Sequence, residues 1–311
     1  MSTSRAGYVS GLVAYLCWGL FPLYWRLLRP STPLEILAHR IVWSLVFVLV
    51  LIAVSRSWRR LRGLLRARTI GRIAVAATLI AINWGTYIYG VNADRVVETS
   101  LGYFINPLVT VLLGVIVLRE RLSVPQWVAI GIGALAVGVL TVDYGQLPVL
   151  ALVLAASFGL YGLIKKRLAV PATEGLAIES GLLTLPASAY LVVMASTGDS
   201  TFGHVSAAHT ALLVASGVVT GIPLIAFAAA ANRIPLSAIG LLQYIAPILQ
   251  LGCGVLILGE PMPAARLAGF GLVWVALAVF TWDGIRRLRS TTRTPVVAAP
   301  TISAADSVIA S

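Results

Sequence analysis

Long apolar stretches separated by short polar connections run through almost the whole chain. Ten of these stretches reach the length of about 20 mostly apolar residues that a membrane-spanning helix needs. They cover residues 8–27, 34–55, 70–91, 97–118, 125–142, 147–164, 176–196, 208–231, 236–258 and 264–284. In lipid, a spanning segment must satisfy its own backbone hydrogen bonds. The pattern therefore predicts an all-α polytopic membrane protein with ten transmembrane helices.

The composition favours the same class of protein. Of the 311 residues, 59% are hydrophobic and 11% are charged, and the mean hydropathy is +0.94. A soluble domain is about 45–50% apolar and about 25% charged, so a water-soluble enzyme and a disordered chain are both excluded. Cys17 and Cys253 lie inside apolar stretches without metal-binding spacing, and the sequence contains no phosphate-binding loop or hydrolase motif. The sequence thus predicts no enzymatic activity, no metal site and no cofactor.

The basic residues alternate between the two sides of the predicted membrane. Of the 23 Lys and Arg residues, 18 fall on one side and four on the other, with Arg40 inside a span. The richer side holds Arg5, the seven Arg of residues 56–72, Arg119, Arg121, Lys165, Lys166, Arg167, Arg233, Arg286, Arg287, Arg289 and Arg293. Because cytoplasmic loops are enriched in Lys and Arg, both termini are predicted to be cytoplasmic. The same rule explains the net charge of +12 without a nucleic-acid partner.

The two halves of the chain resemble each other at a shift of 140 residues. Residues 104–143 match residues 244–283 at 11 of 40 positions, including Pro107 with Pro247 and Glu120 with Glu260. Each half has five spans, so the second half enters the membrane from the opposite side, as in many secondary transporters. We expect an N-terminus at 1–7, a first repeat at 8–143, an inverted second repeat at 144–285 and a disordered cytoplasmic tail at 286–311.

Ionisable residues inside predicted spans are costly and usually functional, and we single out His39, Arg40 and Glu179. His39 and Arg40 follow one another in the second span, and Glu179 occupies the His39 position in the second half. His39 and Arg40 are candidates for contact with a substrate, and His39 and Glu179 are candidates for carrying a proton. The alternatives are structural: Arg40 pairs with Glu35 or Glu98 at the membrane rim, and Glu179 pairs with Lys165, Lys166 or Arg167.

Polar aromatic and amide side chains in four other places are candidates for lining a central cavity. They are Trp43, Asn83, Trp84, Tyr87, Tyr103, Asn106, Gln243 and Tyr244. Pro107 and Pro247 interrupt equivalent spans and are predicted hinges. Interhelical hydrogen bonding and purely structural kinks are the alternative explanations. Five tryptophans are expected to lie at the membrane interface or to face lipid: Trp18, Trp25, Trp127, Trp274 and Trp282.

Several short strings resemble the RarD subfamily of the EamA family, within the drug/metabolite transporters. The strings are Trp18-Gly19, His39-Arg40 with Trp43-Ser44, Asn83-Trp84, SLGYFINPL at residues 100–108, Tyr161-Gly162 and Gln243-Tyr244-Ile245. The resemblance covers roughly residues 7–287. It implies a permease of the bacterial inner membrane with two EamA domains. The superfamily moves amino acids, nucleotide sugars, drugs and other metabolites, and some RarD members carry the label chloramphenicol-sensitive, so the substrate stays open.

Together these patterns predict a secondary active or facilitative transporter of a small organic solute that works by alternating access. The solute would be a metabolite, an amino acid or a drug such as an amphenicol. The predicted partners are this solute, the lipid bilayer and a coupling proton, and the oligomeric state stays open. Two alternatives remain. A non-transporting scaffold predicts an interior packed with apolar side chains, and a lipid flippase or scramblase requires a lateral opening between spans.

Overall fold

The computed structural model describes residues 3–119, 121–168 and 170–291, and these residues form helices and short connections. The elements are α1 (Thr3–Leu27), α2 (Pro33–Ser55), α3 (Trp58–Leu64), α4 (Ala67–Asn92), α5 (Val96–Leu118), α6 (Val124–Tyr144), α7 (Val149–Leu168), α8 (Ala172–Thr197), α9 (Ala207–Ala231), α10 (Leu236–Leu242), α11 (Ile245–Gly252), the π-helix η1 (Cys253–Ile257) and α12 (Ala264–Thr291). Within the described residues, eight helices are long and apolar enough to span a membrane, and Val149–Lys165 and Ile245–Ile257 form two shorter apolar helices. These ten segments match the ten predicted spans and confirm the all-helical fold.

Local sequence signals explain where several helices begin and end. Thr32 precedes Pro33 at the start of α2, and its hydroxyl accepts a hydrogen bond from a backbone N–H of the first turn. Ser123 and Gln126 form a reciprocal capping box at the start of α6. Gly145 and Gly198 end α6 and α8 in the left-handed conformation that glycine adopts without strain.

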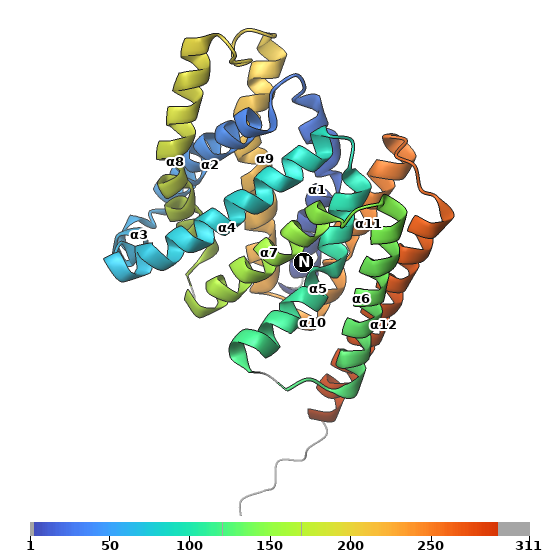
Figure 1. Cartoon of the computed structure of the whole chain (residues 1–311). Coiled ribbons are helices and arrows are strands. Elements are labelled where there is room, and N and C mark those ends of the chain that lie inside the picture. The colour runs from blue at the N-terminus through green and yellow to red at the C-terminus, as the bar shows by residue number, and fades with distance from the viewer. Residues whose placement is uncertain (1–2, 120, 169, 292–311) are drawn as a thin grey trace, which may run out of the picture.

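The packing of the helices follows a pseudo-two-fold pattern (Figure 1). In the first half α1 packs on α9 and α11, and in the second half α7 packs on α4 and α5. The helices α2 and α8 contact each other, as do α6 and α12. Because each of the long helices has its main partner in the other half, the two five-helix repeats interlock rather than fold as separate bundles.

The span predicted at residues 236–258 is not one helix. It is divided into α10, α11 and η1, with a turn at Gln243 and Tyr244. Pro247 has no N–H to offer the carbonyl of Gln243 four residues earlier, and this explains a break at that point. The equivalent Pro107 lies inside α5, which is continuous. The two halves therefore differ in shape at the position where their sequences agree best.

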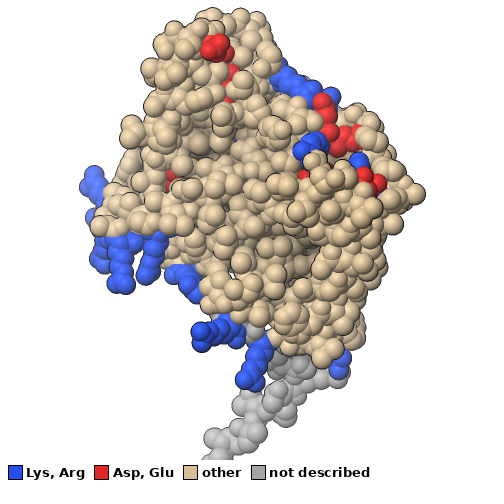
Figure 2. Space-filling model, viewed as in Figure 1, with Lys and Arg blue, Asp and Glu red and all other residues tan. Residues whose placement is uncertain are grey.

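Two smaller predictions at the polar ends need correction. The loop predicted at residues 56–72 contains the short helix α3, and α12 continues to Thr291, so the predicted tail does not begin at residue 286. The rest of that tail, residues 292–311, lies outside the described residues. α3 carries Arg59, Arg60 and Arg62 at exposed positions. In Figure 2 Lys and Arg gather around this end of the molecule, whereas Asp and Glu lie mainly toward the other end. We call the end that carries α3 the basic face.

The helices α2 and α9 approach each other unusually closely. A Cβ atom at Gly217 would collide with the backbone of Trp43, and one at Gly221 would collide with the ring of Phe47. Glycine at both positions removes the side chain that would hold the helices apart, as is common at helix contacts in membranes. The contact fixes the face of α2 that carries His39, Trp43 and Phe47 against the second half of the protein.

Candidate functional site

Arg40 lies in an aromatic cage formed by α1 and α4. It is the eighth residue of α2, so it lies about 10 Å from the start of that helix and within the apolar thickness of a bilayer. Its side chain is 3% exposed. The guanidinium carbon lies 3.9 Å from the ring centre of Trp84, 4.8 Å from that of Trp25 and 5.8 Å from that of Phe21. Ring faces attract a cation through their quadrupole.

A hydrogen-bonded group from α4 and α5 borders the cage. The hydroxyl of Tyr103 donates to Oδ1 of Asn83 at 3.3 Å, and the rings of Tyr87 and Tyr103 meet edge to face at 5.6 Å. Nδ2 of Asn83 donates to the carbonyl of Leu154 at 3.0 Å and to Ser157 at 3.1 Å, which ties α4 to α7. Tyr24, Tyr87 and Tyr103 are within electrostatic reach of the guanidinium. We call Phe21, Trp25, Arg40, Asn83, Trp84, Tyr87 and Tyr103 the Arg40 cluster.

Within the described residues, Arg40 forms no ion pair. The rim pairing expected as its structural alternative is wrong, because both carboxylates have other partners. Glu35 accepts hydrogen bonds from the hydroxyl of Ser200 and the N–H of Thr201. Glu98 pairs with Arg95 and accepts the N–H of Leu150 at the start of α7. The positive charge of Arg40 is therefore surrounded by aromatic rings rather than by acids.

His39 faces the connection between α8 and α9. Its ring stacks on Phe202 with centroids 4.8 Å apart, and it is 5% exposed. Beside it, Ser31 bonds Thr201 at 2.5 Å and Nε2 of His209 at 2.8 Å. Together with the bonds to Glu35, these contacts hold the α8–α9 connection over the start of α2. These contacts anchor the connection beside His39, at the end of the molecule opposite the basic face.

Glu179 lies in a buried polar group of its own. Nζ of Lys165 lies 2.7 Å from its carboxylate, and the hydroxyl of Tyr161 donates to it at 3.2 Å. Glu179 is 2% exposed. This is the structural pairing with Lys165 that the sequence left open. At the shift of 140 residues, Lys165 occupies the position of Trp25 and Tyr161 that of Phe21. One half therefore surrounds its site with rings, and the other half holds an ion pair there.

The remaining predicted site residues lie around the Arg40 cluster or away from it. Trp43 lies at the contact between α2 and α9, and Nε1 of Trp43 and Oδ1 of Asn106 are buried without a hydrogen-bond partner. Tyr244 packs on the core between α5, α6 and α12, and its hydroxyl lies 3.5 Å from Thr281 of α12. Gln243 lies beside Tyr244 in the turn between α10 and α11. The structure thus directs Tyr244 toward α12 and not toward the Arg40 cluster.

Sequence reasoning missed the contribution of α1 to the cage. Trp25 was expected at the membrane interface or facing lipid, but its side chain is 0% exposed. Trp18 is also partly buried and packs against Tyr15 and Phe227. The expectation for Trp127, Trp274 and Trp282 agrees with their exposure of 52%, 42% and 55%. The spacing of Phe21 and Trp25, one helical turn apart on one face, is the signal that could have identified the cage.

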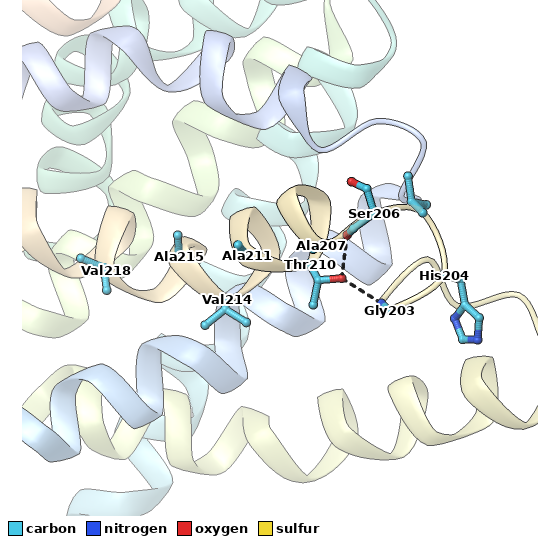
Figure 3. A pocket seen from close by; sticks show the side chains of 10 residues that line it. Gly203, His204, Ser206, Ala207, Thr210, Ala211, Val214, Ala215 and Val218 are labelled. Atoms are coloured by element: carbon cyan, nitrogen blue, oxygen red, sulfur yellow. Dashed lines mark hydrogen bonds between the residues drawn. The ribbon is translucent and has the colours of Figure 1, made fainter.

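A groove of about 650 Å³ lies elsewhere, along α9 and the α8–α9 connection (Figure 3). His204, Ser206 and Thr210 line its polar end, and Ala211 and Val218 lie along its apolar floor. Every lining residue comes from α9 or from the connection before it, and none belongs to the Arg40 cluster. The groove is widely open to the surroundings of the protein, so it is a surface feature rather than the central site.

Comparison with known proteins places this arrangement in a family. The sequence model of the EamA-like transporter family matches residues 5–142. The chain is 51% identical over 301 residues to "Protein RarD" of Streptomyces exfoliatus, with 96% of each chain covered. The chain belongs to the RarD subfamily of EamA-like transporters. Two further subfamily relatives carry different names. "Uncharacterized transporter YojE" of Bacillus subtilis is 41% identical over 92% of this chain and 97% of its own. "Chloramphenicol-sensitive protein RarD" of Pseudomonas aeruginosa is 30% identical over 94% and 99%.

A solved crystal structure has the same fold. It aligns with 91% of this chain and 99% of its own chain, with a TM-score of 0.59 and 18% sequence identity. At this identity the likeness concerns the fold alone. Family membership and the apolar helices together identify an integral membrane protein of a transporter family. None of the names of the RarD-subfamily relatives quoted above indicates a catalytic activity.

Proposed function

We propose that the protein is a secondary active or facilitative transporter that moves a small organic solute by alternating access around the Arg40 cluster. The observation that carries the proposal is a buried cluster of charged and polar side chains among α1, α2, α4 and α5, at membrane depth. Several of its hydroxyl oxygens and ring nitrogens are buried without a hydrogen-bond partner, among them the hydroxyl of Tyr87 and Nε1 of Trp25. Such groups are expensive in a membrane interior and mark substrate pathways.

The interlocked pseudo-two-fold packing supports the alternating-access part of the proposal. If the halves can exchange their conformations, the contacts beside His39 break in one of the two states and access passes from one end of the molecule to the other. We assign residues 8–143 and 144–285 to the two repeats, with Pro107 and Pro247 as hinges. We propose Trp43, Asn106 and Gln243 as further residues of the pathway, whereas Tyr244 packs toward α12 and is not included. The excess of Lys and Arg at the basic face supports a cytoplasmic location for both termini, in the inner membrane of a bacterium.

Two other functions were open at the level of sequence. A scaffold protein predicts an apolar interior, and the buried Arg40, Asn83 and His39 favour a transporter over it. A lipid flippase needs a lateral path to its centre. The groove along α9 is open to lipid, but its lining does not include the Arg40 cluster. Movement of a labelled phospholipid in the experiment below would revive the flippase.

The test is solute flux into proteoliposomes that contain the full chain, with pooled amino acids, amphenicols and organic acids. Tyr103→Phe removes the hydroxyl that binds Asn83 and should lower flux by about fivefold, the equivalent of about 1 kcal/mol for one hydrogen bond. Tyr144→Phe is the control, because it makes the same change at a buried hydroxyl that has no hydrogen-bond partner and lies beside Arg266, outside the cluster. Unchanged flux in Tyr103→Phe, or no flux from folded protein, would contradict the proposal.

Proton coupling is tested with an imposed pH gradient in the same vesicles. Flux that rises with the gradient in the wild type and ignores it in Glu179→Gln would make Glu179 a coupling residue, and the same comparison applies to His39→Gln. Flux that ignores the gradient in every variant would indicate a facilitator or exchanger. Glu179 would then be only the structural partner of Lys165.

A further inference from the structure

The electrostatics of Arg40 determine what the Arg40 cluster can bind. A guanidinium remains charged at any physiological pH, and moving it out of water costs several kcal/mol unless an opposite charge compensates. Neither of the two carboxylates expected beside Arg40 forms an ion pair with it among the described residues: one oxygen of Glu35 accepts hydrogen bonds from Ser200 and Thr201, and Glu98 pairs with Arg95. The protein therefore maintains a buried positive charge without a described acid beside it.

Ring faces compensate only part of this charge. Trp84, Trp25 and Phe21 approach the guanidinium over their faces, but a guanidinium has five N–H donors that seek acceptors. Nε of Arg40 has no hydrogen-bond partner although the side chain is 97% buried. The hydroxyl of Ser44, one turn further along the same face of α2, and that of Tyr87 are also buried without partners. The site thus has buried hydrogen-bond donors, but no described anion accepts hydrogen bonds from them.

We infer that the Arg40 cluster binds the carboxylate of a small organic monoanion, whose apolar body packs against the aromatic rings around it. This inference rests on the proposed function and names its substrate class. A carboxylate receives two parallel N–H bonds from a guanidinium. Its single negative charge neutralises the single cation, whereas a dianionic phosphate would leave one charge uncompensated. The cage has no described acid to receive an ammonium group, so the charge balance favours a monocarboxylate over an amino acid.

Three ligands with the same apolar body separate these possibilities. They are 3-phenylpropionate, its neutral amide 3-phenylpropionamide, and phenylalanine, which adds an ammonium group. Binding to the full chain in nanodiscs is measured as a ligand-dependent rise in the unfolding temperature, because a ligand that binds only the folded state stabilises it. We expect 3-phenylpropionate to bind at least about tenfold more tightly than the other two, since each tenfold corresponds to about 1.4 kcal/mol.

Two substitutions of Arg40 test whether the guanidinium causes the preference for the carboxylate. Arg40→Met keeps an unbranched side-chain stem and removes the guanidinium with its charge. It should abolish the preference for the carboxylate over the amide while leaving the ligand-free protein equally or more stable, because an uncompensated buried charge is gone. Arg40→Lys keeps a charge but loses the two-pronged contact, and should weaken carboxylate binding by about tenfold. A purely structural Arg40 predicts the opposite, a less stable Arg40→Met protein.

The following results of these binding experiments would overturn the inference. Equal binding of acid and amide, or an undiminished preference in Arg40→Met, would remove Arg40 from recognition. A response to chloride or inorganic phosphate equal to that of 3-phenylpropionate would reject the organic class. If Arg40→Met fails to fold, Arg40→Lys still tests the inference. An Arg40→Lys protein that binds the carboxylate as tightly as the wild type would exclude the two-pronged contact. Binding of the carboxylate without flux of any solute would instead reject the transporter proposal, so the two failures can be told apart.

Discussion

At the scale of single residues, the buried charges of the two halves have different surroundings. Arg40 is surrounded by rings, whereas Glu179 pairs with Lys165 and accepts a hydrogen bond from Tyr161. The two partners of the pair are not equally buried, with side chains of 19% exposure for Lys165 and 3% for Glu179. Loss of one partner should therefore have unequal effects.

We predict that Lys165→Met destabilises the protein more than Glu179→Gln. Lys165→Met leaves a deeply buried carboxylate alone, at a cost of about 3 kcal/mol. Glu179→Gln leaves an ammonium that can reach the membrane surface along its flexible stem, so its cost should be smaller. The double variant should recover most of the stability. Unfolding of detergent-solubilised protein by heat measures all three, and equal losses in the single variants would contradict the reasoning.

At the scale of helices, close packing and proline positions determine the shape of the site. The contact of α2 with α9 depends on Gly217 and Gly221. The division of the ninth predicted span, residues 236–258, depends on the turn at Gln243 before Pro247. Hydrophobic periodicity predicted which stretches are helical, because lipid leaves few other options. It did not predict that α5 stays continuous through Pro107 while its counterpart breaks. A proline only removes one donor, and neighbouring helices decide whether the helix kinks or stops.

Gly217→Ala should lower stability by about 1–3 kcal/mol, because a methyl group would push against the Trp43 backbone and separate α2 from α9. Gly271→Ala in α12 is the matched control, since a Cβ there meets nothing within 4 Å. In a helix interior that control should be neutral or stabilising by up to about 1 kcal/mol. Comparison of the two unfolding temperatures checks the prediction, and similar values would remove the close contact as the cause.

The candidate site was only partly predictable from sequence. Residue type and membrane depth marked Arg40, Asn83, Trp84, Tyr87 and Tyr103, and the structure brings these five together. The sequence of a nearly uniform apolar helix does not indicate which face points into the protein. Trp25 was therefore expected at the membrane interface or facing lipid, although it is buried, and Tyr244 was expected at the central site, although it packs toward α12. Those positions depend on which helices from the other half pack against each face.

At the scale of the whole molecule, the distribution of charge makes a prediction about orientation. The basic face should lie in the cytoplasm. With Cys17 and Cys253 changed to Ala, a single cysteine at exposed Arg60 of α3 should react with a membrane-impermeant maleimide only in inside-out vesicles. A single cysteine at exposed His204 of the α8–α9 connection should react only in right-side-out vesicles or intact spheroplasts. The reverse pattern would invert the topology.

A positive charge held inside the membrane also bears on ion leakage. A polar interior that opens to water in any state of the protein offers a path to protons and sodium ions. A second unit positive charge 4 Å from Arg40 would be repelled by about 4 kcal/mol at an effective dielectric constant of 20, and fixed positive charge excludes cations from other membrane pores in the same way. Arg40→Met should therefore let an acid pulse reach a trapped pH dye faster than in the wild type, and Arg40→Lys should not. The residue that is costly to bury thus also keeps the membrane insulated while the protein stands empty.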